Sequence, residues 1–140
     1  MLVVIDSNVL VSALLSPLSA SASVVTLWQG GRFSLLSSPE QIDELNRVTR
    51  YPNIRQRLNT PLAGRLINEI RHLARLVRPP LPEVLVSPDP SDNYLLAMAR
   101  AGTADYLITG DTRDLLSLNT HEGTEIVTVS HFLNLSGQKS

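Results

Sequence analysis

The sequence lacks cysteine altogether and has only three histidines, which lie far apart at positions 72, 121 and 131. Disulfide bonds and thiolate metal sites are therefore excluded, and a histidine-based zinc cluster is not expected. Any metal that this chain binds should be a hard cation held by oxygen atoms.

Long apolar runs are also missing. No stretch approaches the roughly 20 residues that a membrane-spanning helix needs, and no basic region precedes the short apolar segment at the N-terminus. We expect a cytoplasmic protein with no membrane partner. With 140 residues, of which 43% are hydrophobic, the chain has the length for one domain with a core of its own, and it contains no internal repeat, linker or second domain.

The formal charge of −1 hides an uneven distribution. Between residues 45 and 82 eight arginines face a single acid, whereas between residues 83 and 125 eight acids face two arginines. The first segment has the charge to hold a polyanion, and the second supplies carboxylates. The alternative is an ordinary solvated helix face, since a net charge near zero predicts no general affinity for nucleic acid. If the arginines do hold a polyanion, the candidates are Arg47, Arg50, Arg65 and Arg75.

The chain opens with an uninterrupted apolar run, Leu2 to Ile5, that leads directly into Asp6. This pattern is typical of a strand buried on both faces, and open parallel sheets place their ligands at the carboxyl ends of such strands. Residues 104–111 repeat the layout, with an apolar strand that runs through Thr109 to Asp111. If the two strands are neighbours, Asp6 and Asp111 share one edge of the sheet. Either acid alone is also explained as a turn former or a helix cap.

A third acid, Glu44, lies in a helix predicted at about residues 39–50. Ser38 as the cap, Pro39 in the first position and Gln41 three residues after the cap form a strong helix start. Glu44 lies beside the apolar stripe of this helix rather than opposite it, so its carboxylate has the reach to extend over a strand end.

A fourth acid, Asp92, belongs to the start of a helix predicted to run to residue 101. Asp89 fits an N-cap with Pro90 in the first helical position, which puts Asp92 in the first turn and adds the amide of the adjacent Asn93. A capping role explains Asp89 completely, but one acid suffices as a cap, so it explains Asp92 less fully.

Strands and helices are expected to alternate, which indicates an α/β fold with a parallel sheet and right-handed crossovers. Further strands are predicted at residues 32–37 and 125–129, with a short strand or extended connection at 84–86. A serine-rich break is expected at residues 16–23, and Ser130 is expected to cap the terminal helix. Further helices are predicted at residues 9–15, 24–28, 53–59, 60–77 and 112–118.

The acids Asp6, Glu44, Asp92 and Asp111, with Asp114 as a further candidate, converge if these loops meet at one edge of the sheet. Four unpaired carboxylates in one cleft would repel each other strongly, and a divalent cation such as Mg²⁺ or Mn²⁺ resolves that repulsion. Two such ions can activate water and stabilise the leaving oxygen of a phosphodiester. The sequence has no cysteine, no G-x-S-x-G elbow and no G-x-x-x-x-G-K-[ST] phosphate loop that would point to other chemistry.

In these segments the sequence resembles the PIN-domain family, close to the toxin components of bacterial toxin–antitoxin pairs. The resemblance rests on VIDSNVLVSAL at residues 4–14, SPEQIDEL at 38–45, DPSDNYLLAMA at 89–99 and ADYLITGD at 104–111, followed by DLL at 114–116. It implies a single domain with parallel strands in the order 3-2-1-4-5 and a metal-dependent ribonuclease site.

By this resemblance the family's acids correspond to Asp6, Glu44, Asp92 and Asp111, with support from the small polar residues Ser7, Asn8 and Thr109. The sequence departs from the family in one place. The family usually has one residue between its last two acids, whereas Thr112 and Arg113 both precede Asp114 here. Asp114 is therefore displaced from the position that the family uses for a ligand.

The expected function is hydrolysis of RNA phosphodiester bonds with Mg²⁺ or Mn²⁺, with a cognate antitoxin protein and a second copy in a homodimer as further partners. One alternative is a Mg²⁺-dependent phosphatase or receiver domain. Against it, a D-x-D start would need an acid where Asn8 stands, and the late lysine of receivers is missing, since the single lysine is Lys139. A second alternative is an inactive PIN-like module that only binds a partner protein.

Overall fold

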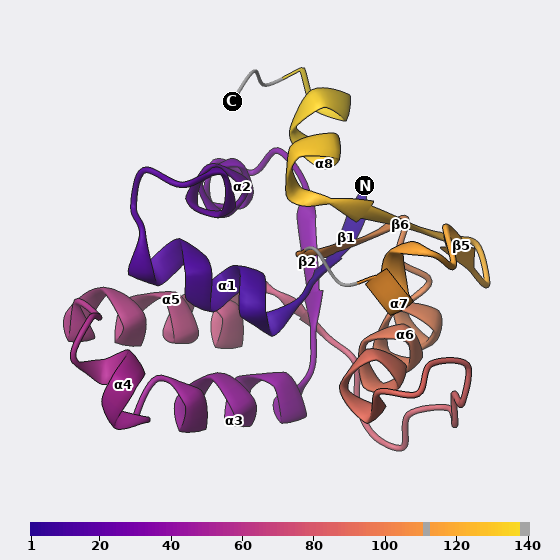
Figure 1. Cartoon of the computed structure of the whole chain (residues 1–140), viewed down its shortest axis with the longest axis horizontal. Coiled ribbons are helices and arrows are strands. Elements are labelled where there is room, and N and C mark those ends of the chain that lie inside the picture. Colours follow the sequence, from indigo (N-terminus) through magenta and orange to yellow (C-terminus); the bar gives the residue numbers. More distant parts are fainter. Residues whose placement is uncertain (111–112, 138–140) are drawn as a thin grey trace.

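The computed structural model describes residues 1–110 and 113–137, which form one sheet between two groups of helices (Figure 1). Within these residues the strands are ordered β3-β2-β1-β4-β6-β5, and all neighbours are parallel except the β5–β6 pair. The strands are β1 (Leu2–Ile5), β2 (Ser34–Ser37), β3 (Arg75–Leu76), β4 (Tyr106–Thr109), β5 (Thr120–His121) and β6 (Thr124–Thr128).

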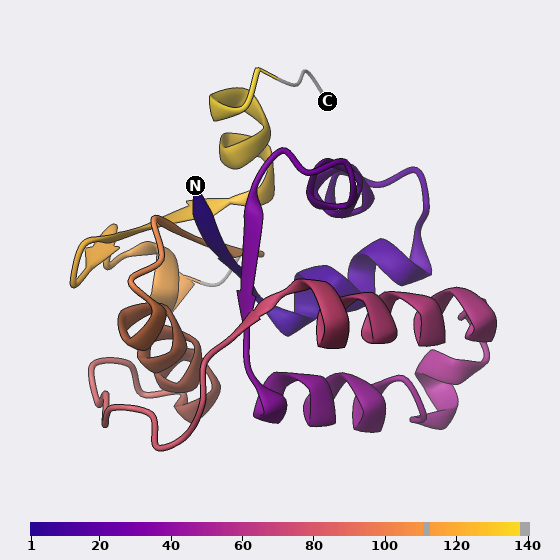
Figure 2. The same cartoon turned by 180° about the vertical axis from the view of Figure 1, so that it is seen from behind.

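Side chains alternate between the two faces of the sheet, and each face has its own core. Val3 and Ile5 of β1 point into one cluster, and Val4 points into the other. Helices α1–α5 and α6–α7 lie on opposite sides of the sheet (Figure 2). The helices are α1 (Ser7–Leu15), α2 (Ala20–Gln29), α3 (Pro39–Val48), α4 (Pro52–Arg55), α5 (Thr60–Leu73), α6 (Pro90–Gly102), α7 (Arg113–Leu116) and α8 (Val129–Leu135).

The α/β fold is confirmed, and so is the order of the parallel strands once the short antiparallel β5 at the edge is set aside. The third strand lies at Arg75–Leu76, beside β2 and inside the helix predicted at residues 60–77, and Val77 N extends the pairing by donating to Ser37 O at 2.8 Å. It does not lie at residues 84–86, for which the sequence left a short strand and an extended connection open. Residues 84–86 are a loop, in which Val84 is apolar because it packs into the core on the α6 side.

The end of α5, at Leu73 rather than at residue 77, and the starts of two other helices also differ from the prediction. Helix α2 begins at Ala20, inside the expected serine-rich break, because the hydroxyl of Ser19 accepts the Ala22 N–H as an N-cap. The terminal helix is capped by Thr128, which accepts the His131 N–H, and not by Ser130. The predicted Ser38 and Asp89 caps are confirmed.

Gly102 closes α6 for a steric reason. A Cβ atom at this position would lie 2.2 Å from Leu36 Cδ2 of β2, so only glycine lets the helix end pack this closely on the sheet. The left-handed residue that ends the helix is Thr103, with φ 53°.

None of the described helices is alone long and apolar enough to cross a bilayer; α1 and α2 reach that length only when counted together across a 102° bend.

Candidate active site

Asp6 lies where β1 ends and α1 begins, and both of its carboxylate oxygens are engaged. Oδ1 accepts the backbone N–H of Asn8 at 3.0 Å, which makes Asp6 the N-cap of α1. Oδ2 accepts the hydroxyl of Thr109, the last residue of β4, at 2.9 Å. Asp6 is 7% exposed and therefore has a fixed orientation at the carboxyl edge of the two central strands. The side chain of Asn8 is exposed, and its backbone provides this contact.

Ser7 connects the same edge to α3. Its hydroxyl donates to Glu44 Oε1 at 2.5 Å and accepts a hydrogen bond from Gln41 Nε2 at 3.2 Å. The buried Gln41 also donates to the carbonyl of Ile5 at 2.8 Å, and its Oε1 accepts the hydroxyl of Ser37 at 2.6 Å. Gln41 thus fastens α3 to the ends of β1 and β2, which holds Glu44 beside Ser7, the residue that follows Asp6.

Asp92 lies in the first turn of α6 and is only 4% exposed. The hydroxyl of Ser87 donates to its Oδ2 at 2.9 Å. Asn93 does not point at the site. Its amide accepts the N–H groups of Val86 and Ser87 and donates to the Ser87 carbonyl, and thereby fastens the loop that carries the Ser87 hydroxyl.

The pKa of Asp92 is raised above its ordinary value, first because burial disfavours the charged form. The neighbouring carboxylates of Asp89, Asp6 and Asp114 raise this pKa further, whereas the Ser87 hydrogen bond lowers it. Asp6 and the exposed Asp114 are therefore close enough to Asp92 for their charges to act on its carboxyl, as a shared site requires.

Tyr94, on α6, connects this helix to the start of α3 on the other face of the sheet. Its hydroxyl is hydrogen-bonded to that of Ser38, the N-cap of α3. Burial, together with the carboxylates of Glu40 and Glu44, raises the pKa of Tyr94 to about 12, so the phenol stays neutral at physiological pH. The starts of α3 and α6 thus face each other across the site.

Among the described residues no three acids or histidines are close enough to hold one metal ion together. Asp111, the remaining predicted ligand, lies outside the described residues, two positions beyond Thr109. The donors that are described fit a hard cation in kind, because they are all carboxylate, hydroxyl and amide oxygens. Among the described residues of this edge, Asp6 and Asp92 are the buried carboxylates.

The four candidate arginines lie in four different places. Arg47 lines a pocket beside Glu44 and Tyr94, and Arg50 lies two residues past the end of α3 at Val48. Arg75 lies at the opposite, amino end of the strands, in a pocket with Met1 and Asp105. Only Arg47 is therefore adjacent to the candidate active site.

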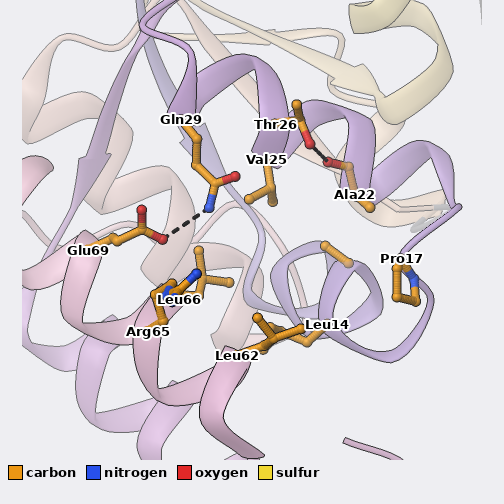
Figure 3. A pocket seen from close by; sticks show the side chains of 11 residues that line it. Leu14, Pro17, Ala22, Val25, Thr26, Gln29, Leu62, Arg65, Leu66 and Glu69 are labelled. Atoms are coloured by element: carbon orange, nitrogen blue, oxygen red, sulfur yellow. Dashed lines mark hydrogen bonds between the residues drawn. The ribbon is translucent and has the colours of Figure 1, made fainter. Parts of the chain in front are cut away.

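Arg65 lies on α5 at the rim of another pocket, between α1, α2 and α5 (Figure 3). Leu14 and Leu66 are among its apolar lining residues, and Gln29 donates to Glu69 across it at 3.0 Å. Leu14 is about 12 Å along α1 from Asp6, so Arg65 faces a different part of the molecule.

Three residues of the site have roles that the sequence does not indicate: Gln41, Ser87 and Tyr94. The sequence assigns Gln41 only to a helix start, and both Gln41 and Tyr94 contact residues that are distant in the sequence, Ile5 and Ser38, so no local spacing points to these contacts. Ser87 is only five residues from Asp92, but a serine in a loop is not distinctive until the fold brings its hydroxyl to the buried carboxylate.

The geometry defines a class of protein: an α/β domain with carboxylates gathered at the carboxyl edge of its parallel strands. The buried Asp6 follows β1, the buried Asp92 belongs to α6 on one face of the sheet, and Glu44 belongs to α3 on the other face. A family model described as "PIN domain" matches residues 2–113, which is most of the chain. The chain therefore belongs to the PIN-domain family, and its fold is of the nuclease type. Neither a curated protein nor a solved structure gave a significant match.

Proposed function

We propose that this protein is a Mg²⁺- or Mn²⁺-dependent endoribonuclease that hydrolyses RNA phosphodiester bonds at the Asp6–Asp92 edge. The observation that carries the proposal is the buried Asp92 carboxyl, whose pKa is raised in part by Asp6 and Asp114. Carboxylates that repel one another without a partner are expected where a divalent cation is to be bound.

In this proposal Asp6 and Asp92 hold the metal, together with Asp111 and, as a further candidate, Asp114. Such a metal supplies activation of water and stabilisation of the leaving oxygen. Thr109 and Ser87 orient the two buried carboxylates by donating to one oxygen of each.

Glu44 either shares in holding the metal or orients the attacking water. The Ser7 hydroxyl occupies its Oε1, which leaves Oε2 for this task. Arg47, one turn farther along α3, is positioned to attract the RNA backbone toward the edge.

The test compares two aspartates that are three residues apart. Asp92→Asn should fold normally and lose RNA cleavage in Mg²⁺ or Mn²⁺, because it removes a charged ligand but keeps an acceptor for Ser87. Asp89→Asn is the matched control. Asp89 accepts the Ser91 N–H as a cap, and asparagine caps nearly as well, so most activity should remain. Equal loss in both variants, or cleavage unaffected by EDTA, would contradict the assignment.

The resemblance to toxin components extends the proposal to a toxin held in check by a cognate antitoxin protein. Growth arrest on expression of the wild-type chain, absent with Asp92→Asn, is the expected result. Growth arrest that persists in this variant would indicate an effect that does not depend on cleavage, as expected for an inactive binding module.

A further inference from the structure

A separate cavity lies at the outer ends of α3 and α5, where α4 bridges the two helices (Figure 1). Its volume is about 310 Å³. The polar residues that line it are Asn46, Thr49, Arg50, Arg55 and Thr60.

The wall of this cavity has hydrogen-bond donors and two positive charges but no carboxylate. Between residues that the structure describes, neither guanidinium group takes part in an ion pair or a side-chain hydrogen bond. The first turn of α5 is already capped, since Asn59 accepts the Leu62 N–H at 3.2 Å. The two arginines, rather than the helix end, therefore determine what this cavity binds, and an anion is the ligand that suits them.

Helix α3 connects the cavity to the candidate active site. Glu44 and Arg47 lie one turn apart on this helix, and Arg50 follows two residues after its last residue, Val48. An RNA strand that leaves the active-site edge along α3 meets Arg47 first and then the pair Arg50 and Arg55.

We propose that Asn46, Arg50, Arg55 and Thr60, which we name the arginine cavity, bind a backbone phosphate of the RNA a few nucleotides away from the scissile bond. This inference rests on the proposed function. A guanidinium fork matches the oxygens of a phosphate in two-point geometry, and two such forks on one cavity define where the phosphate lies. Contacts of this kind fix the register of the strand without reading its bases.

The experiment measures the binding of a single-stranded RNA, in EDTA and at several salt concentrations, to the wild-type protein and to two double variants. Arg50→Gln with Arg55→Gln removes the charges of the arginine cavity. Arg57→Gln with Arg71→Gln is the matched control, because it removes the same charge from two exposed arginines that do not line the cavity. Thermal unfolding verifies that each variant folds.

The slope of log K against log salt should decrease in magnitude by about 0.7 in the cavity variant, the value for one phosphate of a single strand. The control should keep the wild-type slope, and Arg50→Lys with Arg55→Lys should restore most of it because the charge returns. An unchanged slope in the cavity variant, or an equal change in the control, overturns the proposal.

Cleavage separates failure of this inference from failure of the proposed function. The cavity variant should cleave a dinucleotide, which is too short to reach the arginine cavity, as well as the wild type does, and should lose efficiency only on longer RNA. If the wild type cleaves RNA but both proteins show the same length dependence, the cavity proposal alone is wrong. If the wild type neither binds nor cleaves RNA, the proposed function fails and this inference fails with it.

Discussion

Gln41 provides the sharpest test of how this fold holds its candidate active site. The variant Gln41→Met keeps the volume and the helix propensity of the side chain but removes one acceptor and both donors. In this variant the buried carbonyl of Ile5 and the buried hydroxyl of Ser37 lose their hydrogen-bond partner, the Gln41 amide. Each net hydrogen bond contributes about 1 kcal/mol, and an unsatisfied buried group costs about 1–3 kcal/mol, so the free energy of unfolding should fall by about 3 kcal/mol.

For a chain of this length, that loss lowers the midpoint of thermal unfolding by about 10 °C. The control is Gln29→Met, which removes a single hydrogen bond, to Glu69, on the exposed surface. The control should change the free energy of unfolding by less than about 0.5 kcal/mol. Urea unfolding of both variants measures the difference, and RNA cleavage should fall only in Gln41→Met, because Ser7 and Glu44 lose their fixed orientation. Equal stability of the two variants would refute this account.

The remaining predictions concern charge, metal and packing. Burial raises the pKa of Asp92 above 3.8, so the folded protein binds this proton more tightly than the unfolded chain, and Asp92 lowers stability as the pH rises through the raised pKa. Asp92→Asn should therefore be at least as stable as the wild type at pH 7, and its gain in the free energy of unfolding should shrink toward pH 3.8. Urea unfolding across this pH range measures that gain, and a variant less stable than the wild type at pH 7 would contradict the reasoning. Millimolar Mn²⁺ or Mg²⁺ should raise the thermal midpoint of the wild type, and less so in Asp6→Asn; an unchanged wild-type midpoint would count against a metal site. Gly102→Ala should lower the free energy of unfolding by about 1–3 kcal/mol because its Cβ would meet Leu36, and the loss should be smaller in combination with Leu36→Ala, as a double-mutant cycle would measure.

The elements nearest to the candidate site could be predicted because their signals are local. The apolar run before Asp6 is long enough to indicate a strand buried on both faces, and Ser38 and Asp89 stand directly before a proline, as helix caps do. Strand β3 could not be predicted in the same way. It has two residues, and its place beside β2 depends on backbone hydrogen bonds, which any sequence can make.

The side-chain network was beyond sequence reasoning for a different reason. Gln41 and Ser87 are polar residues in a helix and a loop, where polar residues are ordinary, and only the tertiary fold gives them buried partners. Asp6 illustrates the reverse case. The sequence presents helix cap and site residue as alternative roles of Asp6. In the structure only one carboxylate oxygen caps α1 and the other accepts the Thr109 hydroxyl, so the cap does not exclude the site role.

The two cores on either side of the sheet give the candidate site a dependence on the whole molecule. Glu44 belongs to a helix that packs in one core, and Asp92 belongs to a helix that packs in the other. The distance between the Glu44 and Asp92 carboxylates therefore depends on how both helices pack on the sheet, and no short segment determines it by itself. A peptide or a half-molecule that retains every one of these acids would still have no site, and a small shift of either helical layer would alter the chemistry before it unfolded the protein.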